Sequence, residues 1–235
     1  MNNEPALPLY KKLAEDIKNQ ISEGVLKEND KLPTELEFSK KYSVSRITVR
    51  KAMELLADDG YITKHQGIGT FVAAKKLNRI NDKSMGFTDV CESEGKVASA
   101  ELISLEWTTA SVAISQHLCI EEGARVLRIS RIRKCDGIPV MIEDNYFSSK
   151  YSYLTEQDLS KSIYAILRNN GDIPQHGTKT VEVGYATANE AELLNVREGS
   201  VLLLLRGKAT NAAGEVIHYC KQSVNPDRYK LTIIT

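Results

Sequence analysis

Two spacings of hydrophobic residues divide the chain into parts of different character. Near the start, hydrophobic residues that recur at every fourth position predict an amphipathic helix that ends near Gly24. The residues of this stripe are Leu9, Leu13, Ile17 and Ile21. Beyond residue 84 the spacing changes, and hydrophobic residues alternate with polar ones as they do in half-buried strands. The change predicts two domains, a helical one followed by one rich in strands.

A pair of helices is predicted after the first helix. Thr34 precedes Glu37 by three residues, which is the spacing of a capping box, so a helix is expected from Thr34 to about Tyr42. Ser45 follows a short turn and is a favourable N-cap for a second helix of about 14 residues. The hydrophobic residues of this second helix recur at helical spacing and are expected to face the core: Val49, Ala52, Met53 and Leu56.

A short glycine-rich hairpin is predicted next. Gly60 is placed to end the second helix, because glycine readily takes the left-handed conformation that follows a helix. Residues 61–65 and 70–72 have the composition of strands, and residues 66–69 join them with two glycines. Helix, turn, helix and glycine-tipped hairpin, in this order, define a winged helix-turn-helix.

The second helix of the pair carries residues suited to reading DNA. Arg46, Thr48 and Arg50 lie in its first turn and a half, and the equivalent helix of a helix-turn-helix places its N-terminal residues on base edges. Arginine can contact O6 and N7 of guanine together. Residues 38–53 contain no Asp or Glu but five Lys or Arg residues. A solvated surface is the alternative explanation of this charge, but the order of the elements favours DNA binding.

This stretch resembles the GntR family of bacterial transcription regulators. The resemblance is carried by the segments LPTE (32–35), VSRITVRKA (44–52), DGYI (59–62) and QGIGTFV (66–72). It implies that DNA is contacted by Ser45, Arg46, Thr48, Arg50 and Gly67, and we include their neighbours Thr34, Gln66 and Gly69 as candidates. Many members of the family carry arginine where this chain has Leu36, so the resemblance also implies that one DNA contact differs.

Length and composition suit a two-domain cytoplasmic protein. The chain has 235 residues, is 42% hydrophobic and has a formal net charge of +0. No hydrophobic run approaches the ~18–20 residues that span a bilayer, and the N-terminus lacks the pattern of a signal peptide, so we expect no membrane partner. The four cysteines lie far apart without metal-ligand spacing, so we expect reduced, mostly buried thiols and no metal or other cofactor. A redox switch is the alternative for the cysteines.

An α+β domain is predicted after a polar linker over residues 74–84. Residues 1–73 form the predicted winged helix-turn-helix domain, and residues 85–235 form the second domain. Its alternating segments predict strands over 100–107, 125–135, 139–147, 179–187, 201–210, 216–224 and 229–234. Helices are predicted over 87–94, 110–118, 155–159, 162–169 and 188–194. Asp136-Gly137 and Ala213-Gly214 are predicted hairpin turns.

This second half resembles the UTRA effector-binding domain, which marks the HutC branch of the GntR regulators. The resemblance is carried by GFTD (86–89), RIR (131–133) with DGIP (136–139), EDNY (143–146), GSVLL (199–203) and DRYKL (227–231). It implies a mixed sheet with helices that is similar in fold to chorismate lyase. It also implies that this domain serves effector binding and dimerisation.

An anion-binding site is predicted around two arginines. Arg131 and Arg133 lie two residues apart on a predicted strand, so both side chains point to one face, and converging arginines usually hold a phosphate or carboxylate. An ion pair with Glu143 is the alternative. Thr88, Ser162 and Tyr164 lie at or beside predicted helix starts, where free N–H groups favour anions.

The resemblance adds residue roles to this site. In related regulators of amino-sugar phosphates, the phosphate is held by residues that match Phe87, Thr88, Arg131, Arg133 and Ser162. Residues that match Glu143, Glu215 and Tyr219 border the sugar. His117, His176 and His218 are scattered without the spacing of a metal site, so a structural role is expected for each.

The function implied is that of a regulator, not an enzyme. We expect a repressor that binds a palindromic operator in double-stranded DNA as a homodimer and is released by a small anionic effector such as a sugar phosphate. A non-phosphorylated carboxylate or sugar is the alternative effector, and a DNA-bound structural protein without a ligand is a further alternative. An enzyme like chorismate lyase rests on fold analogy alone, because the sequence contains no nucleophile–base pair, metal cluster or phosphate-binding glycine loop.

Overall fold

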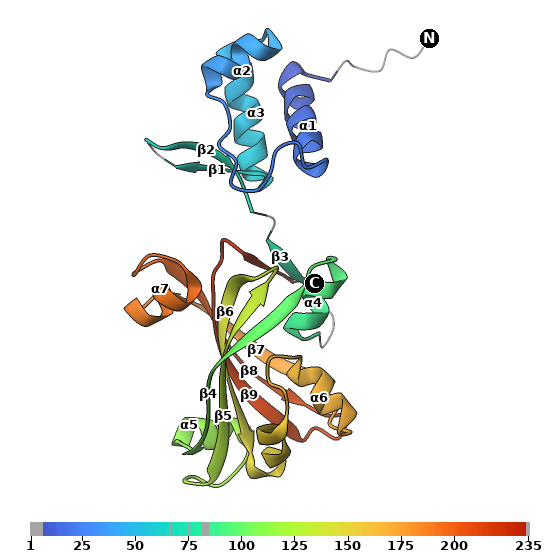
Figure 1. Cartoon of the computed structure of the whole chain (residues 1–235), viewed down its shortest axis with the longest axis vertical. Helices are drawn as coiled ribbons and strands as arrows, with labels where there is room; N and C mark the ends of the chain where they lie inside the picture. Colours follow the sequence, from blue (N-terminus) through green and yellow to red (C-terminus); the bar gives the residue numbers. More distant parts are fainter. Residues whose placement is uncertain (1–6, 66, 75, 81–84, 234–235) are drawn as a thin grey trace. The chain divides into compact units, whose positions relative to one another are not determined.

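The chain divides into two compact units, Met1–Lys75 and Lys76–Thr235 (Figure 1). The computed structural model describes residues 7–65, 67–74, 76–80 and 85–233. Its class is α+β: helices and a small hairpin make up the first unit, and a six-stranded sheet with short helices makes up the second. The fold class expected from the sequence is therefore confirmed.

Three helices build the described part of the first unit: α1 (Leu9–Ser22), α2 (Glu35–Tyr42) and α3 (Arg46–Asp58). Their hydrophobic faces meet in one core, to which α1 contributes Leu13 and Ile17 and α2 contributes Phe38. The residues of α3 that were expected to face the core are buried: Val49, Ala52, Met53 and Leu56. The helical spacing of the sequence thus describes this core correctly.

Both predicted helix caps are present. The Thr34 hydroxyl accepts a hydrogen bond from the backbone N–H of Glu37, and the Glu37 carboxylate accepts one from the backbone N–H of Thr34 at 2.7 Å. Ser45 Oγ accepts from the backbone N–H of Thr48 at 3.1 Å. These caps fix the starts of α2 and α3, and so they fix the tight turn between the two helices.

The glycine-tipped hairpin follows α3 as predicted. Gly60, with a φ of +77°, ends the helix, and β1 (Ile62–His65) then pairs antiparallel with β2 (Gly69–Val72). Ile62 and Val72 lie opposite each other at the buried end of the hairpin. Gln66, predicted at its tip, lies outside the described residues.

A six-stranded antiparallel sheet organises the second unit, in the order β4-β5-β6-β9-β8-β7. Its strands are β4 (Ala98–Thr109), β5 (Arg125–Cys135), β6 (Ile138–Ser148), β7 (His176–Tyr185), β8 (Val201–Thr210) and β9 (Val216–Val224). The turn at Asp136 and Gly137, which both have positive φ, joins β5 to β6. The register places Arg131 directly opposite Glu143.

Short helices cover both faces of this sheet (Figure 1). They are α4 (Phe87–Ser93), α5 (Val112–Leu118), the 3-10 helix η1 (Ser149–Glu156), α6 (Ile163–Asn169) and α7 (Ala188–Leu194). Leu127 and Ile129 of β5 pack against η1 and α6, whereas their neighbour Val126 packs against α5. The alternation of side chains along β5 therefore separates two cores.

Two segments differ from the expected pattern. Residues 77–80 of the expected linker form β3 (Leu77–Ile80), which pairs in parallel with β10 (Tyr229–Thr232) and belongs to the second unit. Residues 75 and 81–84 of that linker lie outside the described residues. The helix expected over 155–159 is not formed. The 3-10 helix η1 lies there instead and begins earlier in the sequence, because Tyr151 and Leu154 are buried in the core.

The four cysteines are free thiols, but fewer are buried than expected. Cys91 and Cys135 are buried, Cys220 is half-buried and Cys119 is exposed. In the described part of the chain, no group of three or more His, Cys, Asp or Glu residues is placed to hold a metal ion. None of the described helices has the length and hydrophobicity needed to cross a membrane.

Candidate DNA-binding surface and effector cavity

The start of α3 presents the predicted DNA-reading side chains at the surface. Arg46 and Arg50 are exposed and Thr48 is half-buried. The Ser45 and Thr48 hydroxyls lie 2.9 Å apart, and because only one of them donates to the other, the second keeps its hydrogen for a phosphate or base. The cap therefore holds two hydroxyls in a fixed position beside two arginines.

An ion pair between two helices orients Arg50. Its Nη2 lies 3.1 Å from Glu35 Oε2 and its Nε lies 3.4 Å from Glu35 Oε1, so α2 and α3 are linked across the turn. Hydrogen bonding to Arg50 lowers the pKa of Glu35, although partial burial opposes the shift. An exposed pair of this kind adds little to the stability of the fold, because solvent screens the two charges. Its main effect is to hold the guanidinium in one orientation while Nη1 stays available.

The remaining candidates on this unit are placed differently from one another. The Thr34 hydroxyl is engaged in the capping box, donating to Glu37 at 2.8 Å, so it is less available to DNA than the Ser45 hydroxyl. Gly67 is exposed with a φ of +75°. Gly69 has a φ of +141°, and a Cβ added there would lie 2.7 Å from Lys31 Cε. Both glycines therefore meet a backbone requirement of the hairpin.

Exposed hydrophobic residues on this unit were not expected from the sequence. Ile47 is 70% exposed between Arg46 and Thr48, and Ile68 is 60% exposed beside Gly67. Leu36, at the position that is often arginine, is 50% exposed. Ile47 lies off the hydrophobic stripe of α3, which is the signal that could have identified it. Apolar side chains at such positions can contact the methyl group of thymine.

A cavity of about 330 Å³ lies in the second unit. It lies against one face of the sheet, between the N-terminal ends of α4 and α6 and the strands β5 to β9, and β3 contributes Arg79. Its volume is within the range of small-molecule sites. Cationic side chains line it: Arg79, Arg131, Arg133 and Lys179. Glu143 is the only carboxylate among the described residues of its lining.

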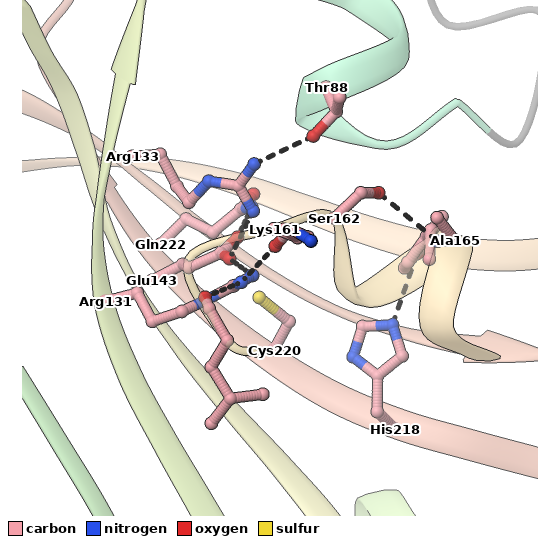
Figure 2. A network of polar contacts seen from close by, with 12 residues as sticks. Thr88, Arg131, Arg133, Glu143, Lys161, Ser162, Ala165, His218, Cys220 and Gln222 are labelled. Carbon is pink, nitrogen blue, oxygen red and sulfur yellow. Dashed lines mark hydrogen bonds and ion pairs between the residues drawn. The ribbon is translucent and has the colours of Figure 1, made fainter. Parts of the chain in front are cut away.

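A buried network joins the two predicted arginines to Glu143 (Figure 2). Arg131 pairs with Glu143 Oε1 and also donates from Nη1 to the backbone carbonyls of Leu159 and Lys161, each at 3.0 Å. Arg133 Nη1 lies 3.1 Å from the same oxygen of Glu143, and its Nη2 donates to Thr88 Oγ1 at 3.0 Å. The predicted ion-pair alternative is thus observed, but one carboxylate serves two guanidinium groups.

The charge of this network is set by burial and by the two arginines. Burial alone would raise the pKa of Glu143, but the charges of Arg131 and Arg133 outweigh it and hold the pKa at about 2. Burial lowers the pKa of Arg131, although its charge persists because Glu143 opposes the effect. The Nε atoms of Arg131 and Arg133 are buried without a hydrogen-bond partner. Net positive charge and free N–H groups therefore remain in the cavity.

The other predicted residues are divided between the cavity and elsewhere. Phe87, Thr88, Ser162 and Tyr164 line the cavity, and the Phe87 ring lies 4.8 Å from the Arg133 guanidinium. Ser162 Oγ accepts from the backbone N–H of Ala165 at 3.2 Å and caps α6 (Figure 2). The sequence thus identifies one wall of the cavity.

Glu215 and Tyr219 do not line the cavity, contrary to expectation. Glu215 lies in the turn between β8 and β9, where it accepts a hydrogen bond from Asn211 Nδ2 at 2.9 Å. Tyr219 points to the opposite face of the sheet and stacks on His117, with ring centroids 4.1 Å apart. The cavity is lined instead by its neighbours His218 and Cys220, because successive side chains of a strand face opposite sides.

The sequence also missed the far wall of the cavity. Arg79, Lys179 and Gln222 come from β3, β7 and β9, which are far apart in the sequence. Their alternation with outward-facing residues was visible, but nothing local indicated which face would enclose a cavity. His218, for which a structural role was expected, lies on the cavity wall with Nε2 3.2 Å from the Tyr164 hydroxyl.

A winged helix-turn-helix, followed by a separate unit with a cation-lined cavity, defines a DNA-binding regulator that responds to a small ligand. Residues 9–72 match the model of the bacterial regulatory proteins of the gntR family, and residues 93–230 match the UTRA domain. The chain therefore belongs to the GntR family of transcription regulators, in the HutC subfamily that carries a UTRA domain. It is a transcriptional repressor of this type, and the relatives it matches are regulators rather than enzymes.

Individual relatives match nearly the whole chain. The HTH-type transcriptional regulator YurK of Bacillus subtilis (strain 168) is 31% identical, with 99% of this chain and 98% of that protein covered. The HTH-type transcriptional repressor NagR of the same organism is 27% identical, with coverage of 97% and 95%. The crystal structure of PhnF from Mycobacterium smegmatis matches 97% of this chain and 99% of its own with a TM-score of 0.73 and 25% identity.

Proposed function

We propose that this repressor binds a palindromic operator as a homodimer in the bacterial cytoplasm and releases it when a sugar phosphate occupies the cavity. Two copies of α3 related by a two-fold axis suit two half-sites of a palindrome. The edge strand β7 supports a dimer contact through the second units, because its Val183 and Tyr185 side chains are 66% and 71% exposed. The cavity supports the choice of effector.

The charge of the cavity is the observation that carries this proposal. Four cationic side chains face one carboxylate in the described lining, and that carboxylate is already paired with both Arg131 and Arg133. An anionic ligand would compensate the remaining charge. Arg133 is suited to contact it, because among the described residues its Nε has no partner and its Nη2 is held only by the Thr88 hydroxyl. Arg131 is held by two carbonyls and Glu143, so we assign it to positioning Glu143.

The ligand would act on DNA binding through a shift between two states. An effector changes this equilibrium only by its different affinity for the two states. Phosphate contacts at Thr88 would order the start of α4, which follows the residues that connect the two units. We propose that this changes the half-site spacing that the two reading helices can reach. Small-angle scattering that shows the same domain arrangement with and without the effector would contradict this mechanism.

A thermal-shift panel tests the effector class. Sugar phosphates, each beside its unphosphorylated sugar, are compared with small carboxylates on the full chain. A ligand at about 100 times its dissociation constant stabilises the folded state by about 2.7 kcal/mol, which is readily measured. We expect a shift with a sugar phosphate that Arg133→Gln abolishes. A shift with only a carboxylate or a neutral sugar would show that the effector class is wrong.

A single substitution on α3 tests the DNA-reading surface. Arg46→Ala is expected to weaken operator binding by about 1–3 kcal/mol and to relax sequence preference at one position, if Arg46 reads a base. Lys12→Ala on α1 removes the same charge from an exposed site of the same unit and serves as the control. The measurement is a titration by fluorescence anisotropy at two salt concentrations. Equal losses in both variants would indicate a general charge effect instead of base reading.

A further inference from the structure

The far wall of the cavity carries cations that the arginine network does not explain. Arg79 and Lys179 line it, and neither has a carboxylate partner in the part of the chain that the structure describes. The Nε atom of Arg79 is buried without a hydrogen-bond partner. A phosphate beside Arg133 would leave these charges uncompensated, so one anionic group does not account for the cavity.

A single side chain separates the two groups of cations. Gln222 Nε2 lies 3.4 Å from Glu143 Oε2, and Gln222 Oε1 accepts from Lys179 Nζ at 3.4 Å. Lys179 is therefore linked through Gln222 to the carboxylate that holds Arg131 and Arg133. Both groups of cations line the same cavity of about 330 Å³, so one small molecule can contact both.

Arg79 and Lys179 also influence each other. The pKa of Lys179 is lowered, first because surrounding protein reduces the hydration of its ammonium group and second because Arg79 is positively charged. The Lys179 side chain as a whole still has an exposed surface. Arg79 is half-buried and lies beside the Tyr229 hydroxyl on β10. Two like charges held together without a counterion are unfavourable, and an anionic group between them would relieve the repulsion.

We propose that the effector carries two separated anionic groups, with a phosphate at Arg133 and Thr88 and a second carboxylate or phosphate at Arg79 and Lys179. This inference rests on the proposed function, because it extends the same cavity. It narrows the effector from sugar phosphates in general to phosphorylated sugar acids or bisphosphates. It also places the second anionic group of the effector in contact with Arg79 of β3, the first strand after the residues that connect the two units.

Calorimetric titration of the full chain tests this inference with four probes. Glucose 6-phosphate carries one anionic group, 6-phosphogluconate adds a carboxylate, fructose 1,6-bisphosphate adds a phosphate, and gluconate carries the carboxylate alone. We expect at least one of the doubly anionic probes to bind about 10- to 100-fold more tightly than glucose 6-phosphate. The better of the two then identifies the second group as carboxylate or phosphate.

Variants separate the two ends of the ligand. In the double variant Arg79→Gln/Lys179→Gln, the doubly anionic probe is expected to bind less than about threefold more tightly than glucose 6-phosphate. The affinity for glucose 6-phosphate itself should change little. Arg206→Gln, which removes an exposed cation paired with Glu182 on a neighbouring strand, is the control and should preserve the advantage. Lys179→Gln alone, at an exposed side chain, repeats the test if the double variant unfolds.

The outcomes distinguish this inference from the function on which it rests. Equal binding of singly and doubly anionic probes, or an advantage that survives in the double variant, would overturn the second anionic site but leave the sugar phosphate proposal intact. Absence of binding by every phosphorylated probe would overturn both.

Discussion

Replacing Glu143 by alanine is expected to lower the free energy of unfolding of the second unit by about 3–5 kcal/mol, because it leaves two buried guanidinium groups without their carboxylate. Arg131 is 1% exposed and Arg133 is 4% exposed, so both guanidinium groups are held away from bulk water. The carbonyls of Leu159 and Lys161 would still accept hydrogen bonds from Arg131, but they carry no full charge. Urea denaturation of the full chain, followed by circular dichroism, measures the loss.

A matched exposed pair provides the control for this prediction. Glu182 pairs with Arg206 on adjacent strands of the same sheet, but the two side chains are 51% and 47% exposed. Glu182→Ala should therefore cost at most about 1 kcal/mol. A similar loss in the two variants would show that burial does not determine the strength of these pairs.

Acid is expected to destabilise the second unit by about 3 kcal/mol between pH 7 and pH 4 through His218 alone. Burial lowers the pKa of His218 from 6.5 to about 4, although the charge of Glu143 opposes the shift. The folded state therefore keeps the imidazole neutral while the unfolded state binds a proton below pH 6.5. The stability is complete above this value and is lost as the pH falls towards 4. Glu143 stays ionised in this window, since its pKa is about 2.

The variant His218→Gln isolates this contribution. Glutamine does not titrate, so the difference in unfolding free energy between wild type and variant should change by about 3 kcal/mol from pH 7 to pH 4. Carboxylates elsewhere titrate in both proteins and cancel in the comparison. Parallel pH profiles would mean that His218 is not buried in its neutral form.

The first unit could be predicted almost residue by residue because its signals are local. The capping residues Thr34 and Ser45 lie within three residues of the N–H groups that they satisfy, and Gly60 ends α3 by its own conformation. No distant part of the chain had to be known. The exception is Ile47, which was not singled out although its position off the hydrophobic stripe of α3 indicates its exposure.

The second unit was predictable in its strands but less so in their partners. Alternation alone gave the bounds of β5, β8 and β9, whereas β3 was missed because its four residues are held by β10 near the other end of the chain. No pattern within residues 77–80 reveals that partner. Pairing across such a sequence separation is a property of the fold.

The candidate site shows the same division between local and distant information. Arg131 and Arg133 were assigned to one face from their spacing, and the register of β5 and β6 then placed Glu143 beside them. Tyr219 was chosen where His218 faces the cavity, and a shift of one residue along a strand exchanges its two faces. Arg79 and Lys179 could be recognised only when β3 and β7 had been brought to the same cavity.

The parallel pairing of β3 with β10 also sets the length of the tether between the two units. β2 ends at Val72 and β3 begins at Leu77, so only a few residues connect them while the pairing holds. Release of the four residues of β3 would lengthen this connection by roughly 14 Å at full extension. In the proposed homodimer, whose half-sites would lie roughly 34–36 Å apart along DNA, this added reach would widen the set of operator spacings that the two reading helices can span. The pairing of β3 with β10 would then limit the operator spacings that the proposed homodimer can bind.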